Sequence, residues 1–135
     1  MRKHDAAVAL LFCLGAAALV LAQSGAGGKD AEVVKKGQAL YSQHCVSCHG
    51  KTTDGDGPAA SSLKIAPSNL TKISERHKGF PAEKMMDYIS GEKYAVGHGS
   101  RQMPVWGKRF RPAPGTGTSA EIAALTKYLE SIQQK

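Results

Sequence analysis

The sequence has little cysteine: only Cys13, Cys45 and Cys48 occur among its 135 residues. It contains no internal repeat and no GxGxxG or P-loop pattern, which argues against nucleotide chemistry. No nucleophile–base pair or dense acidic cluster points to hydrolysis. A second CxxC pair and an HxxxH pair are also lacking, so a zinc site would have to recruit His77 or His98 from afar. These absences direct attention to the short stretch around the two central cysteines.

The chain begins with a basic start and a long apolar run. Arg2, Lys3 and His4 precede residues 6–22, which are mostly alanine and leucine, and small residues follow. This order is typical of a secretory signal peptide that is cleaved after Ala22. It predicts an exported, periplasmic protein. The alternative is an uncleaved membrane anchor, because the run approaches the roughly 17–25 apolar residues that a spanning helix needs.

Removal of the signal peptide, residues 1–22, would leave one small domain. Residues 23–30 are rich in glycine and predict a flexible N-terminal tether, which places the folded domain at 31–135. Arg2, Lys3 and Asp5 leave with the signal, so the formal charge falls from +7 to +6. The expected mature protein is therefore small and basic.

Cys45 and Cys48 stand three residues apart, and His49 follows directly, in the stretch CVSCHG. A disulfide between them would close so small a loop that it would stabilise little. A thioredoxin-like redox pair would need a βαβ context, whereas the flanking sequence is typical of helices. The pattern indicates covalent haem attachment, in which each thiol adds to a vinyl group and the histidine ligates the iron. We predict one covalently bound haem c with its iron, and the disulfide stays as the alternative.

The iron of such a haem normally takes a sixth ligand. Met103 lies in HGSRQMPVWG, where Pro104 forbids a regular helix and favours an extended backbone at the methionine. A thioether on a non-helical loop can wrap over the ring face opposite His49. We therefore predict His49 and Met103 as the axial ligands. The alternatives are His98, a stronger base five residues away, and an iron without a sixth ligand.

Several separate features of the chain together resemble the class I cytochromes c of bacteria. They run from about Ala31 to the C-terminus: Gly37 and Tyr41 upstream of CVSCHG, the GDGPAASSL loop, the APSNLT segment, the MPVWG loop and the closing helix EIAALTKYLESIQ. The resemblance implies an all-α cytochrome c fold with three or more helices and long loops that wrap one haem.

The residues themselves predict the same kind of fold. Asp30 is expected to cap a first helix with the apolar stripe Val33, Val34, Gly37, Leu40 and Tyr41. A middle helix is expected over about 82–90, before the natural stop Gly91. Thr118 and Glu121 predict a capping box for a last helix with Ile122, Leu125, Tyr128, Leu129 and Ile132 at helical spacing. No stretch alternates well enough to predict a sheet.

The glycine within the first helix predicts a close helix crossing. Glycine costs about 1 kcal/mol relative to alanine in a helix interior, so Gly37 indicates the approach of another backbone. In the family that the sequence resembles, the first and last helices cross. Here that crossing would place Gly37 and Tyr41 against Leu125 and Tyr128.

We also predict roles for three further residues near the haem motif and the MPVWG loop. By resemblance, Pro58 matches a proline whose carbonyl accepts a hydrogen bond from the ligand histidine, which would increase the donor strength of that ligand. Its alternative role is to end a glycine-rich turn. Trp106 is expected either to pack against a haem edge or propionate, or to lie in the core. His44 is expected to face solvent.

A haem with both axial positions filled has no free position for substrate or oxygen, but it can change charge by one electron. We therefore predict a periplasmic one-electron carrier between respiratory or dehydrogenase partners, and no enzyme activity of its own. One alternative is a haem-bearing subunit of a larger oxidoreductase complex. Another is a haem-based gas sensor in which Met103 leaves the iron.

The partners expected for this carrier are redox proteins with acidic docking surfaces. Basic residues flank Met103 on the side where the family exposes its haem edge: Lys93, Arg101, Lys108, Arg109 and Arg111. Opposite charge on a partner would raise the encounter rate. No nucleic acid and no small-molecule substrate are expected, and contact with a membrane is expected only if the N-terminal segment stays uncleaved.

Overall fold

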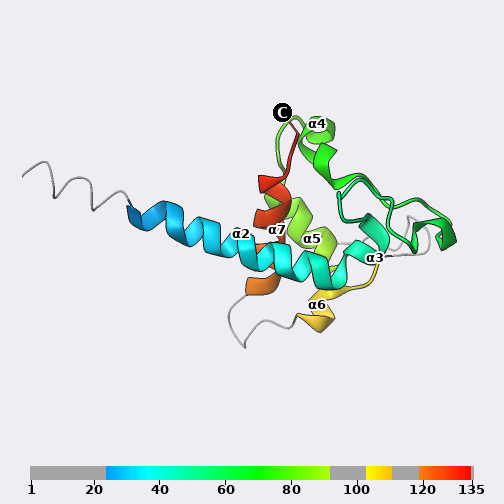
Figure 1. Cartoon of the computed structure of the whole chain (residues 1–135), viewed down its shortest axis with the longest axis horizontal. Coiled ribbons are helices and arrows are strands. Elements are labelled where there is room, and N and C mark those ends of the chain that lie inside the picture. Colours follow the sequence, from blue (N-terminus) through cyan, green and yellow to red (C-terminus); the bar gives the residue numbers. More distant parts are fainter. Residues whose placement is uncertain (1–23, 92–102, 111–118, 135) are drawn as a thin grey trace, which may run out of the picture. The chain divides into compact units, whose positions relative to one another are not determined.

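The computed structural model describes residues 24–91, 103–110 and 119–134 (Figure 1). The chain divides into two compact units, Met1–Glu32 and Val33–Lys135. In the first unit, the described residues form the beginning of one long helix. The candidate site residues that the structure describes all belong to the second unit.

The described residues form helices and no strands, which confirms the predicted all-α fold. The elements follow one another as α2 (Ser24–His44), α3 (Val46–His49), the 3₁₀ turns η1 (Ala60–Ser62) and η2 (Leu70–Lys72), α4 (Ile73–His77), α5 (Ala82–Ser90), α6 (Trp106–Arg109) and α7 (Ala120–Ser131). None of the helices in the described part of the chain has the length and apolarity needed to span a bilayer. The apolar run 6–22 lies outside these residues, so its cleavage or retention stays a prediction.

Helix α2 begins earlier than the sequence predicted. The chain is helical from Ser24, so the expected tether over 23–30 is helix over nearly all its length, and Asp30 lies inside α2 instead of capping it. The physical reason is that an existing helix grows by one hydrogen bond for each residue it orders. No proline interrupts the stretch 24–44. A Cβ built on Gly27 or Gly28 would meet no described atom within 4 Å, so these positions are open.

The close crossing of the first and last helices is confirmed. A Cβ on Gly37 of α2 would collide with the carbonyl oxygen of Ala124 in α7 and would lie 2.7 Å from the Cβ of Tyr128. The rings of Tyr41 and Tyr128 meet with centroids 5.4 Å apart and planes tilted by 48°. Glycine at position 37 is therefore the residue that lets the two backbones touch.

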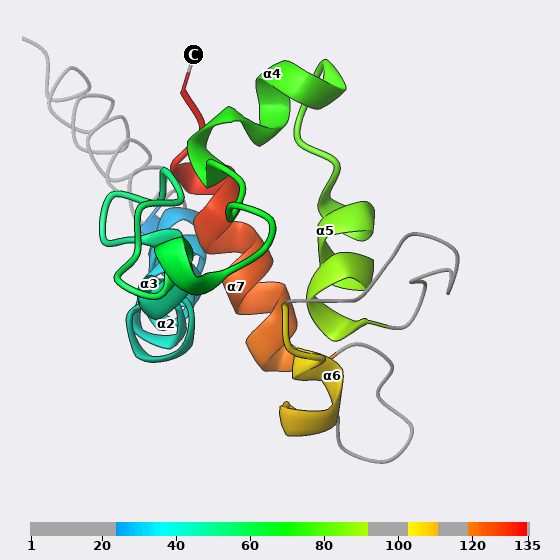
Figure 2. The same ribbon diagram turned by 90° about the vertical axis from the view of Figure 1, so that its right-hand side faces the viewer.

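The core forms around this crossing. Its buried side chains come from α2, α5, α7 and the residue after α6: Tyr41, Ile89, Phe110, Ile122, Leu125, Tyr128 and Leu129. Helices α5 and α7 lie side by side, as Figure 2 shows. Helix α5 has the predicted bounds, and Gly91 ends it in the left-handed conformation with φ of 81°. The apolar stripes predicted for the first and last helices supply most of these core residues, although Val33 of the first stripe is 38% exposed.

The cap of α7 differs from the prediction by one residue. Ser119 is the N-cap, and its hydroxyl accepts a hydrogen bond from the amide of Ile122 across 3.2 Å. Thr118, the predicted cap, lies outside the described residues. The reason is geometric, because the cap side chain has to reach the third helical amide from the residue directly before the helix.

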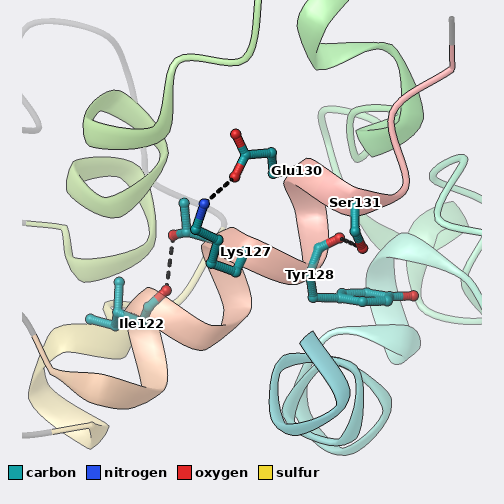
Figure 3. Close-up of polar contacts among 6 residues, drawn as sticks. Ile122, Lys127, Tyr128, Glu130 and Ser131 are labelled. Carbon is teal, nitrogen blue, oxygen red and sulfur yellow. Dashed lines mark hydrogen bonds and ion pairs between the residues drawn. The ribbon is translucent and has the colours of Figure 1, made fainter. Parts of the chain in front are cut away.

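Figure 3 shows polar contacts along α7. The buried Thr126 hydroxyl donates to the carbonyl oxygen of Ile122 across 2.8 Å. Ser131 donates to the carbonyl oxygen of Tyr128 across 2.7 Å. Lys127 pairs with Glu130 at 2.8 Å on the exposed side. A helix with these local partners can bury most of its surface at little cost in unsatisfied polar groups.

Candidate functional site

The haem-attachment motif lies on a single helical turn that continues directly from α2. The amide of Cys45 donates to the carbonyl oxygen of Tyr41 across 2.8 Å. The carbonyl oxygen of Cys45 then accepts from the amides of Cys48 and His49, at 3.2 and 2.9 Å. Both thiols and the imidazole therefore project from one short, hydrogen-bonded turn. This is the arrangement that attachment of one ring at two points beside a ligand histidine requires.

The two cysteines are free thiols in the structure. Burial, followed by the nearby Cys48, raises the pKa of the Cys45 thiol to about 12. The Ser47 hydroxyl donates to the sulfur of Cys48 across 3.9 Å. Thiol exchange and metal coordination need a thiolate, which the surroundings of Cys45 disfavour.

The imidazole of His49 is held by the backbone of a distant residue. Its Nδ1 lies 3.2 Å from the carbonyl oxygen of Ser68. Burial lowers the pKa of His49, and the hydrogen bond to Ser68 acts in the opposite direction. A neutral ring that donates its Nδ1 hydrogen to a carbonyl keeps the lone pair of Nε2 for a metal. In that tautomer His49 would hold a metal through Nε2, and its role as an iron ligand stays a prediction.

Ser68 takes the position in this hydrogen bond that the resemblance gave to Pro58. Pro58 is exposed, and the described partner of the histidine ring is the Ser68 carbonyl. The role of Pro58 stays a prediction. Ser68 was not identified from the sequence, because any residue supplies a backbone carbonyl and no side-chain type marks it.

The glycine-rich loop that the sequence shows before Pro58 wraps the end of α3, a contact that the sequence did not predict. The amides of Gly55 and Gly57 donate to the carbonyl oxygens of His49 and Cys48, at 2.9 and 3.2 Å. A Cβ on Gly57 would lie 2.6 Å from the carbonyl carbon of Cys48 and would also meet the carbonyl oxygens of Val46 and Ser47. This loop satisfies the last carbonyls of the turn that carries Cys48 and His49.

Met103 lies outside any helix, as Pro104 predicts, and its side chain is 36% exposed. It precedes α6 by three residues. The rival ligand His98 lies outside the described residues. The choice of sixth ligand therefore stays a prediction.

Trp106 begins α6, and its side chain packs against the core. Its ring stacks on Phe110 with centroids 5.6 Å apart and planes 17° from parallel. A contact of Trp106 with a haem edge stays a prediction.

His44 was expected to face solvent, and this expectation is wrong. The residue is half-buried, and the centroid of its ring lies 5.4 Å from that of Trp106 and 5.3 Å from that of Phe110. His44 is far from Trp106 and Phe110 in the sequence, so no local sequence pattern predicts their contact.

The basic residues expected around Met103 fall only partly within the described residues. Lys108 and Arg109 of α6 are exposed, whereas Lys93, Arg101 and Arg111 lie outside the described residues. Among the residues described, no group of three or more His, Cys, Asp or Glu side chains is placed to hold a metal ion. A zinc site of that kind therefore finds no donor set there.

Comparison with known proteins agrees with this geometry. The sequence profile of the family described as Cytochrome c matches residues 34–133. The chain belongs to the cytochrome c family. Its members hold haem c covalently and transfer electrons, so the family implies a c-type haem with iron and haem-based electron transfer for this chain.

A curated relative is the Cbb3-type cytochrome c oxidase subunit FixP of Azorhizobium caulinodans. It is 27% identical over 109 residues, which cover 81% of this chain and 30% of the relative. The chain thus spans less than a third of the length of that protein. No solved structure matches the chain.

Proposed function

We propose that the protein is a periplasmic one-electron carrier that uses one haem c with His49 and Met103 as axial ligands. The turn of α3 carries most of this proposal. It brings both thiols and the ligand histidine together, and the carbonyl of Ser68 holds the Nδ1 of His49 at 3.2 Å. When bound, the haem supplies an iron that takes up and gives back one electron.

The chain's own residues bind and orient this group. Cys45 and Cys48 would fix the ring at two points, which would place His49 beside the iron. Met103 would supply a thioether to the same iron, and thioether ligation raises the potential relative to two histidines. With both ligand positions of the iron filled by the chain, the protein would pass electrons between other proteins and catalyse no reaction itself.

The proposal also includes export to the periplasm and docking to acidic redox partners. The basic start and apolar run at residues 1–22 support secretion to the periplasm. The exposed Lys108 and Arg109 lie close in sequence to Met103 and support docking to redox partners with acidic surfaces. Such pairing acts mainly on the encounter rate and weakens with added salt.

Ligand substitution tests the axial assignment. The oxidised protein should show the weak red sulfur-to-iron charge-transfer band, and Met103→Ala should abolish it while the haem stays attached. Met103→His should lower the reduction potential, because imidazole favours ferric iron more than thioether does. His98→Ala is the matched control and should change neither the band nor the potential. The assignment fails if His98→Ala shifts the potential and Met103→Ala does not.

Covalent attachment has its own test. Mass spectrometry of the exported protein should give a chain that begins near Gln23 with one haem added. Acid extraction of the denatured protein should leave that mass unchanged. Release of all the haem would contradict attachment through Cys45 and Cys48.

A second candidate function is a haem-bearing subunit of a larger oxidoreductase. The relative whose name describes an oxidase subunit favours it. Both functions need the same site, so the state of assembly distinguishes them. A free monomer in gel filtration of the periplasmic extract would support the carrier. Strong binding of carbon monoxide by the reduced protein would instead favour a gas sensor, since a tightly ligated iron should respond weakly.

A further inference from the structure

One cluster of side chains has no part in the proposed carrier so far: the three rings of His44, Trp106 and Phe110. The His44 imidazole lies 5.4 Å from the Trp106 ring and 5.3 Å from the Phe110 ring, centroid to centroid. The two aromatic rings are themselves stacked at 5.6 Å. His44 is the last residue of α2, whereas Trp106 begins α6 and Phe110 follows it. The cluster therefore joins two segments that are distant in sequence.

Helix α6 depends on contacts of this kind. It has only four residues, and so short a helix is not stable without tertiary packing. On one side Gly107 lies against α5, where a Cβ would be 2.6 Å from the carbonyl oxygen of Ser90. The contact with α2 comes from His44. Helix α6 is thus held by a glycine contact to α5, by the ring contact with His44 of α2 and by the packing of Trp106 on the core.

The two ends of the His44 contact adjoin residues of the candidate haem site. His44 directly precedes Cys45, which begins the attachment turn. Trp106 follows Met103 by three residues, and Pro104 restricts the backbone between them. The ring contact therefore links the backbone that carries Cys45 to the backbone that carries Met103.

We propose that His44 is a positioning residue that holds α6, and with it Met103, in place for iron ligation. This inference rests on the proposed ligation by His49 and Met103. Ring pairs in the observed range of centroid distances are stabilising beyond the area they bury. They favour the arrangement in which the thioether reaches the metal over one in which the Met103 segment moves away. Loss of the His44 ring should therefore weaken Met103 as a ligand without removing it.

Competition by added imidazole measures this effect, because imidazole takes the iron position that Met103 leaves. We expect the oxidised haem-bearing His44→Ala protein to bind imidazole about tenfold more tightly than wild type, which corresponds to 1.4 kcal/mol. Its red sulfur-to-iron band should be weaker before imidazole is added. His44→Phe keeps a ring at the same place and should behave like wild type. His77→Ala is the matched histidine control, since His77 is exposed at the end of α4.

Circular dichroism first establishes that each variant is folded. Wild-type imidazole affinity and an unchanged band in His44→Ala would overturn the proposal, as would a His44→Phe protein as weakened as His44→Ala. If His44→Ala does not fold, His44→Leu and His44→Phe decide: equal imidazole affinities would show that the ring is not needed. Failure of the proposed ligation looks different, because wild type would then lack the red band or Met103→Ala would leave it intact.

Discussion

Tyr41 donates a hydrogen bond from its hydroxyl group to the carbonyl oxygen of Gly50, across 2.7 Å. The side chain is buried, and this burial raises the pKa of the hydroxyl, so it stays a donor at any ordinary pH. Gly50 directly follows His49 and has a φ of 79°, a backbone conformation that favours glycine. The bond therefore ties the core face of α2 to the residue where the chain leaves the attachment turn.

Tyr41→Phe should destabilise the protein by about 1–3 kcal/mol, because it leaves a buried carbonyl without its donor. Urea denaturation followed by circular dichroism gives the change in the free energy of unfolding. Tyr88→Phe is the control. Tyr88 is 40% exposed, so water can take the place of the hydroxyl in any hydrogen bond that the substitution removes. Equal stability of Tyr41→Phe and wild type would show that the bond contributes nothing net.

Two glycines of the same helix should respond in opposite ways to alanine. Gly37→Ala should lose about 1–3 kcal/mol or more of stability, because its Cβ meets the backbone of Ala124. The Cβ added in Gly28→Ala meets no described atom within 4 Å, so helix propensity should increase the stability of this variant by up to about 1 kcal/mol. Thermal unfolding of the two variants gives the comparison. A stabilised Gly37→Ala protein would contradict the close crossing.

Gly57→Ala should reduce haem attachment. The added Cβ would push against the backbone of Val46, Ser47 and Cys48 and displace the turn that presents Cys48 and His49. The measurement is the ratio of covalent haem to polypeptide in the exported protein, taken from absorbance and mass spectrometry. Gly27→Ala makes the same chemical change at an open position and should keep the wild-type ratio.

The ion pair between Lys36 and Glu121 predicts a pH dependence of stability. Its Nζ and Oε1 atoms lie 3.2 Å apart, and it joins α2 to α7. A hydrogen bond from its own backbone amide, and then the one from Lys36, lowers the pKa of Glu121 below its ordinary value of 4.5. A carboxyl group whose folded pKa is lowered stabilises the fold above the unfolded pKa and stops doing so as pH falls through the folded pKa.

Wild type should therefore exceed Glu121→Gln in stability at neutral pH, and the difference should shrink as pH falls below 4.5. Urea midpoints of both proteins over that range measure the difference. The effect should be small and reduced by salt, because the side chains of Lys36 and Glu121 are 50% and 35% exposed. A difference that stays constant with pH would mean that Glu121 acts through packing instead of charge.

The sequence predicted the parts of this structure that local periodicity determines. The bounds of α5 and most of the apolar positions of α2 and α7 follow from local patterns. The meeting of Gly37 and Tyr41 with Tyr128 was implied by the resemblance to the class I cytochromes c, and the helical glycine agreed with it. The start of α2 was missed because helix growth overrides a few glycines, and the cap of α7 was misplaced by one residue.

The candidate site was harder to complete from sequence. Side-chain chemistry marks Cys45, Cys48 and His49, and the structure puts all three on one turn. The ring contacts of His44 and the hydrogen bond that the Ser68 carbonyl accepts from His49 join residues that no local pattern connects. Such partners become visible only when the chain is folded.

The Ser68 carbonyl has a further consequence for how this protein can be altered. Because the acceptor for His49 is backbone, an alanine scan would pass over it, and random exchange of side chains would leave it in place. If His49 ligates the iron as proposed, this hydrogen bond is therefore shielded from most side-chain exchanges. Changes in the length of the loop between residues 50 and 68 would alter it, and they would add to Met103 a second, backbone-based means of shifting the redox potential.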